Sequence, residues 1–577
     1  QLVAELGESA DGTTEFVIYM AEQADLSQAF QIQDRSARGH YVYNALRATA
    51  ERTQAGLRAE LANSGITYEA RTIVNALVAK GSLGLVESVA ARPEVAYVGA
   101  NRAVPAPKPV QIQPGVEGVD TVEWNIDRVQ ANDVWSAFGA QGEGIVVANI
   151  DTGVQWDHPA LVNQYRGGPG GSHNYNWWDP YGERPTVPED YHNHGSHTMG
   201  TMLGDDGGIN QIGMAPKARW FACNGFSEDT GEGYEAELLE CADFVLAPWD
   251  LNGQNPNPDL RADIVNNSWG GGQAQWWYNQ AVYAWQAAGI FPVFSAGNEG
   301  PDCETAGDPG DMPNMLAVGA LDINDSNAPG SLAGFSSRGP ADVSGAIKPN
   351  VSAPGASIRS AFKNGSYGSM NGTSMASPHV AGQAALIWSA QPELLGNVQL
   401  TYWIIEQTSD PLLVNQQLLG SPYYCGTDTA SSVPNNQYGY GRINAYDAVQ
   451  MAINENWDIP WLTVHPTGGA VAPGGSTQIG LTFDSQGLTP GECYPGTLLV
   501  DYNDPDVVQA LVPLELCVAP AYLDYEPVPG DLLPGDPFSY EIVLGNLGSP
   551  VAGAVLSTTL PVEVDYHSSD PLGVYDP

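Results

Sequence analysis

The chain has 577 residues, which is more than one hydrophobic core accommodates, so we expect three to five domains. Its 66 Asp and Glu residues against 21 Lys and Arg give a formal net charge of -45, which excludes nucleic acid and anionic membranes as partners. Because no stretch reaches about 18 consecutive apolar residues, a membrane-spanning helix is excluded as well. The acidity fits either solubility in a salty or extracellular medium or the binding of calcium.

The first hundred residues predict a small α/β unit. Glu15–Met20 is strand-like, and Ala37–Leu61 has the spacing of a helix. Two β-rich runs, a second helix and a last strand follow, at Ile66–Ala70, Thr72–Val78, Leu83–Ala91 and Val95–Val98. The order βαββαβ predicts a ferredoxin-like domain over residues 1–103. The Pro-rich run VPAPKPVQIQP continues neither a helix nor a central strand, so we expect residues 104–121 to be a linker.

Strands and helices alternate from residue 122 to residue 456. Ile145–Ile150 and Phe291–Ser295 are runs typical of buried strands, and Met375–Ser389 has the pattern of a helix. This alternation predicts a doubly wound parallel sheet with helices on both faces and its chemistry at the carboxyl ends of the strands. The chain then changes to short strands separated by Pro and Gly. We expect an Ig-like β-sandwich over residues 457–518 and a second, similar and incomplete domain over 519–577.

Six cysteines form no CxxC motif and lie near no His cluster, which argues against a zinc site. Their even number predicts disulfides, with free thiols in a reducing cytosol as the alternative. By position we expect Cys223–Cys241, Cys493–Cys517 and, by elimination, Cys303–Cys425. The chain begins at Gln1, which fits either a precursor whose signal peptide has been removed or a trimmed chain.

Three segments place a reactive side chain at the end of a predicted strand or the start of a predicted helix. They are IVVANIDTGVQWDHPAL with Asp151, NHGSHTMGTM with His194, and NGTSMASPHVAG with Ser374. Each residue alone is typical of a helix cap or another structural role. In the order Asp, His, Ser they match one of the known chain orders of the hydrolytic triad.

The D-T-G, H-G-x-H and G-T-S-M-A-x-P segments resemble the signature blocks of the subtilisin-like serine proteases, the subtilases of peptidase family S8. SAGNEG is similar to the oxyanion block of that family. The resemblance covers residues 122–400, and EWNIDRV, NQIGMAP, VNNSWGGG and AAGIFPVFSAGN are most similar to bacillopeptidase F-like enzymes. It implies a secreted, monomeric serine endopeptidase that acts on polypeptides and requires no cofactor for its chemistry.

The resemblance also implies a role for each matching residue. Ser374 is expected to be the nucleophile, His194 the general base and acid, and Asp151 the group that orients the imidazole. Asn298 is expected to donate to the oxyanion together with the backbone N–H of Ser374; its alternative is a turn residue. The neighbouring imidazoles of His158, His197 and His379 are expected to be packing or hydrogen-bonded residues.

Substrate binding follows from the matching strands. The resemblance implies that an extended peptide pairs with the edge formed by Ser268, Trp269 and Gly270. The other wall of the pocket for the residue before the cleaved bond, P1, is expected at Ser295, Ala296 and Gly297, with Gly307 at its floor. Room above Gly307 favours a large apolar P1 residue, whereas Glu299, Asp308 and Asp311 nearby would attract Lys or Arg. We expect broad specificity with a large P1 group.

A structural calcium site is expected in LGDDGGINQI, which has the length and place of a family calcium loop and offers Asp205 and Asp206. However, a carboxylate that the family supplies soon after the triad Asp falls on Ala160. One charged ligand is therefore missing, and both outcomes stay open.

The N-terminal unit resembles the inhibitory propeptide of these proteases, most of all in RPEVAYVGANRAV. The tail after Val98 would then block the active site until it is cut between Arg102 and Glu123; a permanent accessory domain is the alternative. A second alternative is an inactive adhesion or scaffolding protein with a decayed protease domain, although no expected catalytic residue is replaced. A serine-carboxyl peptidase would need Glu and Asp where His194 and Asn298 stand.

Overall fold

A computed structural model describes residues 2–9, 11–115, 122–273, 275, 277–322, 332–341, 344–414, 424–454, 459, 461–465, 476–489, 492–501, 509–518, 521–526 and 541–546. The chain separates into two compact units, the first containing Gln1–Glu455 and the second most of the chain from Asn456 onward. Residues 116–121, near the C-terminal end of the expected processing region, lie outside the described residues. Within the described residues, no helix combines the length and the apolar character needed to cross a bilayer.

The N-terminal part of the first unit has the expected order of elements. They are α1 (Leu2–Glu8), β1 (Thr13–Met20), α2 (Arg35–Asn63), β2 (Tyr68–Arg71), β3 (Ala76–Ser82), α3 (Leu83–Ala90) and β4 (Val95–Ala100). The strands form an antiparallel sheet in the order β2-β3-β1-β4, which is the ferredoxin-like arrangement. The second strand run was expected to begin at Thr72, but Thr72–Asn75 forms a turn in which Asn75 has φ 45°.

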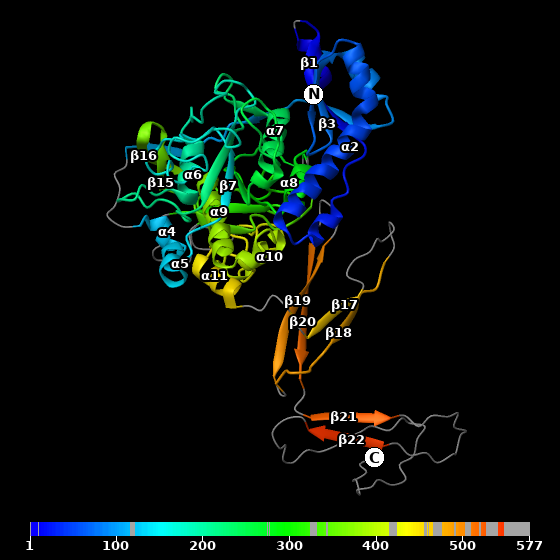
Figure 1. Cartoon of the computed structure of the whole chain (residues 1–577). Coiled ribbons are helices and arrows are strands. Elements are labelled where there is room, and N and C mark those ends of the chain that lie inside the picture. Colours follow the sequence, from blue (N-terminus) through cyan, green and yellow to red (C-terminus); the bar gives the residue numbers. More distant parts are fainter. Residues whose placement is uncertain are drawn as a thin grey trace, which may run out of the picture. The chain divides into compact units, whose positions relative to one another are not determined.

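The two faces of β1 are buried against different partners. Phe16 and Ile18 belong to a core that includes Leu57 of α2 and side chains of α3. Val17 and Tyr19 point to the opposite face, as strand geometry requires, and belong to the large core that includes residues around Leu239 of the same unit. The N-terminal sheet is therefore covered by its own helices on one face and by the rest of the first unit on the other, beside α7 and α8 (Figure 1).

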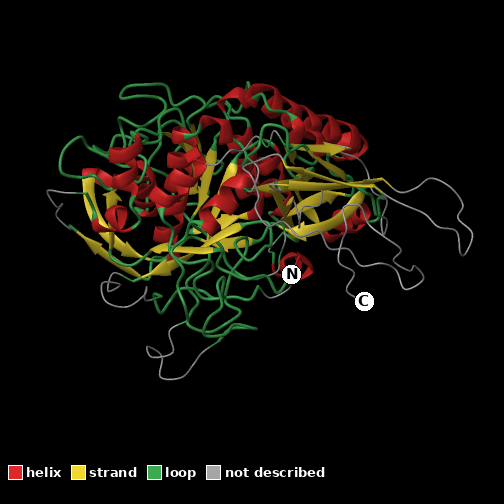
Figure 2. Cartoon of the chain, turned by 90° about the horizontal axis from the view of Figure 1, so that it is seen from below, coloured by secondary structure: helices red, strands yellow, loops and turns green. Residues whose placement is uncertain are grey.

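The centre of the first unit is a seven-stranded parallel sheet in the order β14-β13-β12-β11-β7-β9-β8. Figure 2 shows the strands as a twisted layer with helices packed along it. The strands are β7 (Val146–Asp151), β8 (Trp177–Trp178), β9 (Arg219–Asn224), β11 (Ile264–Asn267), β12 (Phe291–Ser295), β13 (Leu316–Leu321) and β14 (Val351–Pro354). The helices are α4 (Trp124–Arg128), α5 (Ala131–Phe138), α6 (His194–Leu203), α7 (Glu235–Leu246), α8 (Asn279–Ala287), α9 (Thr373–Ala390), α10 (Val398–Gln407) and α11 (Ala445–Asn454).

The segment expected to be a plain linker contains two short strands. β5 (Ala103–Pro105) pairs antiparallel with β10 (Glu232–Tyr234). β6 (Gln111–Pro114) pairs with β16 (Ser366–Asn371), which also pairs with β15 (Ile358–Phe362). Both β5 and β6 lie at the edge of their sheets and end in proline, a position that tolerates the missing N–H group.

Three disulfides join the cysteines in the expected pairs. Cys223–Cys241 links β9 to α7, Cys303–Cys425 joins two loops, and Cys493–Cys517 lies in the second unit. The described strands from residue 462 onward form three pairs. β17 (Leu462–His465) pairs antiparallel with β18 (Gly480–Phe483), and β21 (Ala521–Glu526) pairs antiparallel with β22 (Glu541–Asn546). β19 (Cys493–Asp501) is hydrogen bonded to β20 (Gln509–Cys517). Most of the expected second sandwich, residues 519–577, lies outside the described residues. The sandwich assignment stays a prediction.

Candidate active site

Asp151 and His194 form a buried pair. Asp151 is the last residue of β7 and His194 the first of α6, and their side chains are 1% and 0% exposed. His194 Nδ1 lies 2.7 Å from Asp151 Oδ1, and Thr198 Oγ1 donates to Asp151 Oδ2 at 3.2 Å. Since a carboxylate only accepts, the imidazole proton of this pair belongs on Nδ1, which leaves Nε2 free to take up another proton.

Two glycines allow the strand end and the helix start to approach each other. Gly153 has φ 91°, and a Cβ there would collide with the carbonyl oxygen of Glu189. A Cβ at Gly195 would collide with the carbonyl oxygen of Gly153. The glycines of the D-T-G and H-G segments are therefore required by backbone contact, which explains their spacing around the Asp–His pair.

Asp190, a residue that the sequence reasoning did not single out, holds the loop before His194. Its carboxylate accepts the backbone N–H groups of His192, Asn193 and Ser196 at 2.7–2.9 Å and the Thr152 hydroxyl at 3.0 Å. Burial raises the pKa of Asp190, and the hydrogen bonds oppose that shift. The position of an acid four residues before His194 was the available signal, but the sequence alone did not show that it accepts backbone N–H groups.

Ser374 lies in the first turn of α9, directly after Thr373. Its hydroxyl donates to the carbonyl oxygen of Ser268 at 3.0 Å. Nε2 of His194 is buried and has no hydrogen-bond partner among the residues that the structure describes. The structure therefore brings Asp151 and His194 into contact, whereas the hydroxyl of Ser374 is hydrogen bonded to the backbone instead of the imidazole.

The orientation of the Asn298 amide follows from its neighbours. Oδ1 of Asn298 accepts the backbone N–H of Thr373 at 2.8 Å and the Thr373 hydroxyl at 3.0 Å. Because a backbone N–H can only donate, the amide oxygen must face Thr373 and the amide nitrogen must face away from it. A Cβ added at Gly372 would lie 3.6 Å from that nitrogen, so the amide nitrogen lies at the start of the helix that carries Ser374.

A buried polar network connects the two halves of the site. Asn149, two residues before Asp151, donates to Thr198 Oγ1 at 2.9 Å and accepts from Asn266 Nδ2 at 3.0 Å. Asn266 also donates to Ser268 Oγ and accepts from Ser377 Oγ at 2.6 Å. These five residues, two amides and three hydroxyls, are called the amide network: Asn149, Thr198, Asn266, Ser268 and Ser377. It runs from the helix of His194 to the helix of Ser374.

The segments expected to bind substrate lie next to one another. Gly307 N donates to the carbonyl oxygen of Ala296, and Gly271 N donates to that of Asp308, so residues 295–297 and 268–270 are joined through residues 307–308. A Cβ at Gly270 would collide with the Asp308 carbonyl. β5 lines a cavity together with Trp269 and Gly271 of this region, and it pairs with β10, an element that the sequence reasoning missed.

The first unit matches a known family. The model of the Subtilase family matches residues 142–441, more than half of the chain. Subtilisin E of Bacillus subtilis is 32% identical over 336 residues, which are 58% of this chain and 73% of that protein. The chain belongs to the subtilase family of serine endopeptidases. The fold of this subtilase, a parallel sheet with helices along it, agrees with that membership.

Two further relatives of this subtilase differ in how much of each chain they share. Bacillopeptidase F of Bacillus subtilis is 42% identical over 398 residues, which are 65% of this chain and 26% of that protein, so the match spans about a quarter of its length. A solved structure, the S41 Psychrophilic Protease, is 27% identical and covers 57% of this chain and 99% of its own, with a TM-score of 0.45.

The other histidines beside the signature segments of this subtilase are hydrogen bonded to backbone groups. His158 Nε2 contacts the carbonyl oxygen of Ser366, His197 Nε2 that of Ile358, and His379 Nδ1 that of Met375, all at 2.8–2.9 Å. Burial lowers the pKa of His197 to about 3 and that of His379 to about 4. Both imidazoles are therefore neutral at physiological pH.

The loop expected to bind calcium is closed by its own hydrogen bonds. Asp205 Oδ1 accepts Gly207 N, Asp206 Oδ1 accepts the backbone N–H groups of Gly208 and Asn210, and Asp206 Oδ2 accepts Asn210 Nδ2. The carbonyl oxygen of Ala160 accepts Asp205 N. A carboxylate has about four lone-pair sites, so these hydrogen bonds do not decide whether the loop binds calcium, and the calcium site stays a prediction.

An arginine supplies the positive charge next to that loop. Arg359 donates to Asn210 Oδ1 at 2.6 Å and to Glu123 Oε1 at 2.8 Å, and the side chains of Arg359 and Glu123 are 5% and 6% exposed. Its guanidinium lies 4.5 Å from the ring centroid of Tyr367. Arg359 therefore connects Asn210, by a hydrogen bond, to Glu123, by a buried ion pair.

Proposed function

We propose that this subtilase is a secreted serine endopeptidase, made as a zymogen, in which Asp151, His194 and Ser374 act as the catalytic triad. The observation that carries the proposal is the buried Asp151–His194 hydrogen bond, with Nε2 of His194 unpaired and Ser374 in the first turn of α9. The substrate class is polypeptide in extended form. No cofactor is needed for this chemistry.

The chemistry begins when the Ser374 hydroxyl turns from the Ser268 carbonyl to Nε2 of His194, a hydrogen bond that tightens only in the complex with substrate. His194 takes the proton as Ser374 Oγ attacks the peptide carbonyl, and Asp151 stabilises the imidazolium that forms. The protonated imidazole then donates to the leaving amine, and an acyl-enzyme remains. Water, activated by the same imidazole, releases the acid and restores Ser374.

The developing negative charge on the carbonyl oxygen needs donors that are already in place. The amide nitrogen of Asn298 and the backbone N–H of Ser374 are the proposed donors. The contacts of Asn298 Oδ1 with Thr373 support this role, because they direct the amide nitrogen away from Thr373. The first N–H groups of a helix are unpaired within the helix and carry partial positive charge, which favours the same oxyanion.

The zymogen proposal is supported by the contacts of residues 103–114. β5 pairs with β10, and Val110 N donates to Asn371 O at 2.8 Å where β6 begins to pair with β16. Asn371 is the last residue of β16 and precedes Ser374 by three residues. The segment between β5 and β6 therefore ends, at β6, beside the strand that leads into the proposed nucleophile. A chain held on both sides in this way excludes an external peptide.

The N-terminal unit is held on α7 by specific contacts that fit an inhibitory propeptide. Arg71 pairs with Glu240 at 2.6 Å and donates to the carbonyl oxygen of Ala236 at 2.8 Å. Thr72 and the backbone N–H of Ile73 donate to the carboxylate of Asp243. Disulfides support an extracellular location, since they persist in oxidising compartments.

Labelling with a fluorophosphonate tests the proposal. We expect Ser374 to be labelled after residues up to the processing site are removed and to be far less reactive in the uncut chain. Ser374→Ala should abolish labelling, whereas Ser366→Ala, a change at an exposed hydroxyl, should leave it intact. Label on another serine, or none in the processed form, would overturn the assignment.

A further inference from the structure

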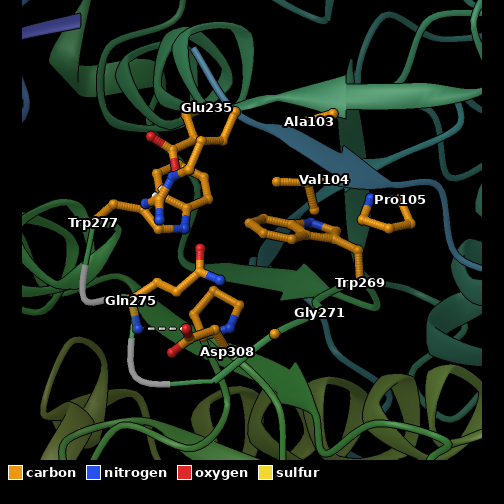
Figure 3. Close-up of a pocket in the computed structure, with 12 residues that line it drawn as sticks. Ala103, Val104, Pro105, Glu235, Trp269, Gly271, Gln275, Trp277 and Asp308 are labelled. Carbon is orange, nitrogen blue, oxygen red and sulfur yellow. Dashed lines mark hydrogen bonds and ion pairs between the residues drawn. The ribbon is translucent and has the colours of Figure 1, made fainter. Parts of the chain in front are cut away.

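A cavity of about 150 Å³ lies where the inhibitory segment meets the catalytic part of the first unit (Figure 3). Its walls come from two sources. Residues 102–105 line one side, and the opposite side is lined by side chains of Glu235, Trp269, Trp277 and Asp308 together with the glycines at 271 and 272. If the chain is cut between β5 and β6, residues 102–105 belong to the released part, whereas the opposite wall remains.

Arg102 fills the polar end of this cavity in the uncut chain. Its guanidinium forms an ion pair with the carboxylate of Glu235, and its carbonyl oxygen accepts the backbone N–H of Glu235 at 3.1 Å. The side chain of Glu235 is 3% exposed and that of Arg102 is 29% exposed. The basic residue directly before β5 is therefore held by both the backbone and the side chain of the first residue of α7.

A second carboxyl group, that of Asp308, lines the cavity. Asp308, which is 3% exposed, accepts the backbone N–H of Gln275 through Oδ2 at 2.6 Å. Burial, together with a side-chain hydrogen bond to Asp311 and its nearby charge, raises the pKa of Asp308 to about 8, so the anionic partner for a cation at this cavity is Glu235. Between the two carboxyls the indoles of Trp269 and Trp277 line the cavity, as Figure 3 shows for the labelled side chains.

We propose that this cavity is a specificity site for a cationic side chain, Arg or Lys, of the peptide substrate, in the place that Arg102 takes in the uncut chain. The site is distinct from the P1 pocket expected at residues 295–297 and 307. It recognises the residue directly before the stretch that pairs with β10. This inference rests on the proposed protease function, because only a substrate strand bound like β5 would place a residue there.

The chemistry of the walls favours a long cation over an apolar side chain. Removal of Arg102 would leave the carboxylate of Glu235 without its ion pair, and a cation of the substrate in the same place would restore that pair. Apolar stems of Arg and Lys pack on aromatic surfaces, and an indole face attracts the charged group. A norleucine residue would pack on the indoles but would not pair with the carboxylate of Glu235.

Substrate profiling of the full chain after its own processing tests the inference. A peptide library is digested, the products are sequenced, and the ratio of Arg and Lys to other residues is determined at each position before the cleaved bonds. We expect an enrichment of about tenfold or more at one fixed position in the native protein and its loss in Glu235→Gln, because charge-assisted hydrogen bonds supply a preference of that order.

Glu237→Gln is the matched control. Glu237 lies on the same helix and binds the N-terminal unit through Asn101 Nδ2 at 3.2 Å, but it does not line the cavity. It should keep the enrichment. No enrichment in the native protein, or enrichment that persists in Glu235→Gln, would overturn the specificity site. Products no different from those of Ser374→Ala would overturn the protease function itself, and the inference with it.

A measurement on the unaltered enzyme covers the case in which Glu235→Gln does not fold. Synthetic peptides of residues 99–110, with Arg102 or with norleucine in its place, are compared as inhibitors of the processed enzyme. The arginine peptide should bind about tenfold or more tightly. Equal inhibition constants would refute the site.

Discussion

Nδ2 of Asn266 donates to Oδ1 of Asn149 at 3.0 Å, and this hydrogen bond joins the strand that ends in Asp151 to the strand that leads to Ser268. Both amides are fully buried. The carbonyl of Ser268 in turn accepts the Ser374 hydroxyl. A contact between two buried side chains thus links the strand that carries Asp151 to the strand whose following residue, Ser268, holds the hydroxyl of the proposed nucleophile.

Asn266→Leu should disrupt the amide network and leave hydrogen-bonding groups of Asn149, Ser268 and Ser377 unsatisfied. Each buried group left unpaired costs about 1–3 kcal/mol. We expect a lower free energy of unfolding in urea and a lower kcat, with KM changed less. Asn252→Leu, at an exposed position, is the control. Unchanged stability and kcat in Asn266→Leu would show that the network is dispensable.

Asn298→Ala should lower kcat about 10²–10³-fold with little change in KM, as loss of the corresponding donor does in subtilisin itself. The reason is that the amide donates to charge present only in the transition state. Steady-state kinetics on one peptide substrate measures both constants. An increase of KM at constant kcat would instead assign Asn298 to ground-state binding.

Release of the N-terminal unit should become easier as pH rises from 5 to 8. In the docked state burial raises the pKa of Glu235 to about 7 and that of Asp243 to about 6, and it raises the pKa of Glu237 and Glu240 as well. The charges of Arg71 and Arg102 lower these pKa values and so oppose the effect of burial. The nearby carboxylates of Glu15, Glu69 and Asp179 raise them further. Release returns the carboxyls to water and to a pKa near 4, so docking takes up protons.

The sign follows from that proton uptake. An acid whose pKa is raised in the docked state favours docking fully below its ordinary pKa, and the advantage is lost as pH rises through the raised value. The rate at which activity appears, divided by the activity of processed enzyme at each pH, should therefore increase between pH 5 and pH 8. Asp243→Asn should flatten the profile. A rate that falls with pH would contradict the mechanism.

If residues 205–212 hold no calcium, a chelator should leave the melting temperature of the protein unchanged. Arg359→Met, in contrast, should strongly lower the free energy of unfolding. Removing one partner of a buried ion pair costs about 3–5 kcal/mol. The double variant Arg359→Met with Glu123→Leu should recover part of the loss, because it leaves no unpaired charge. Scanning calorimetry with and without chelator measures these effects. A large decrease of the melting temperature of the native protein with chelator would support a calcium site in this loop.

The sequence predicted the parts of this site that depend on local backbone geometry. The glycines after Asp151 and His194 mark close approaches that no other residue allows, so the strand and helix ends that carry these side chains were placed correctly. Helix spacing likewise predicted α2 and α9 to within a few residues. The strand-like run Glu15–Met20 predicted β1, although the prediction did not include the burial of both faces of the strand.

Contacts between distant segments left no such pattern. Arg102 and Glu235 are far apart in the sequence, and neither lies in a signature segment. The prolines of residues 104–114 correctly predicted that this segment forms no central strand. Proline is compatible with an edge strand, however, so β5 and β6 were not excluded. The loop with Asp205 and Asp206 had the composition of a cation site, and only the structure revealed that both carboxylates accept hydrogen bonds from N–H groups of the same loop.

If the protein is made as a zymogen, as proposed, a single cut does not complete its activation, because β6 pairs with β16. A break between β5 and β6 would leave β6 covalently joined to the catalytic part through a short connection that ends at Glu123. A strand tethered so closely competes at an effective concentration in the millimolar range, well above most free peptides. The newly made end would act as a captive product, and full turnover would begin only when it is trimmed or moves away.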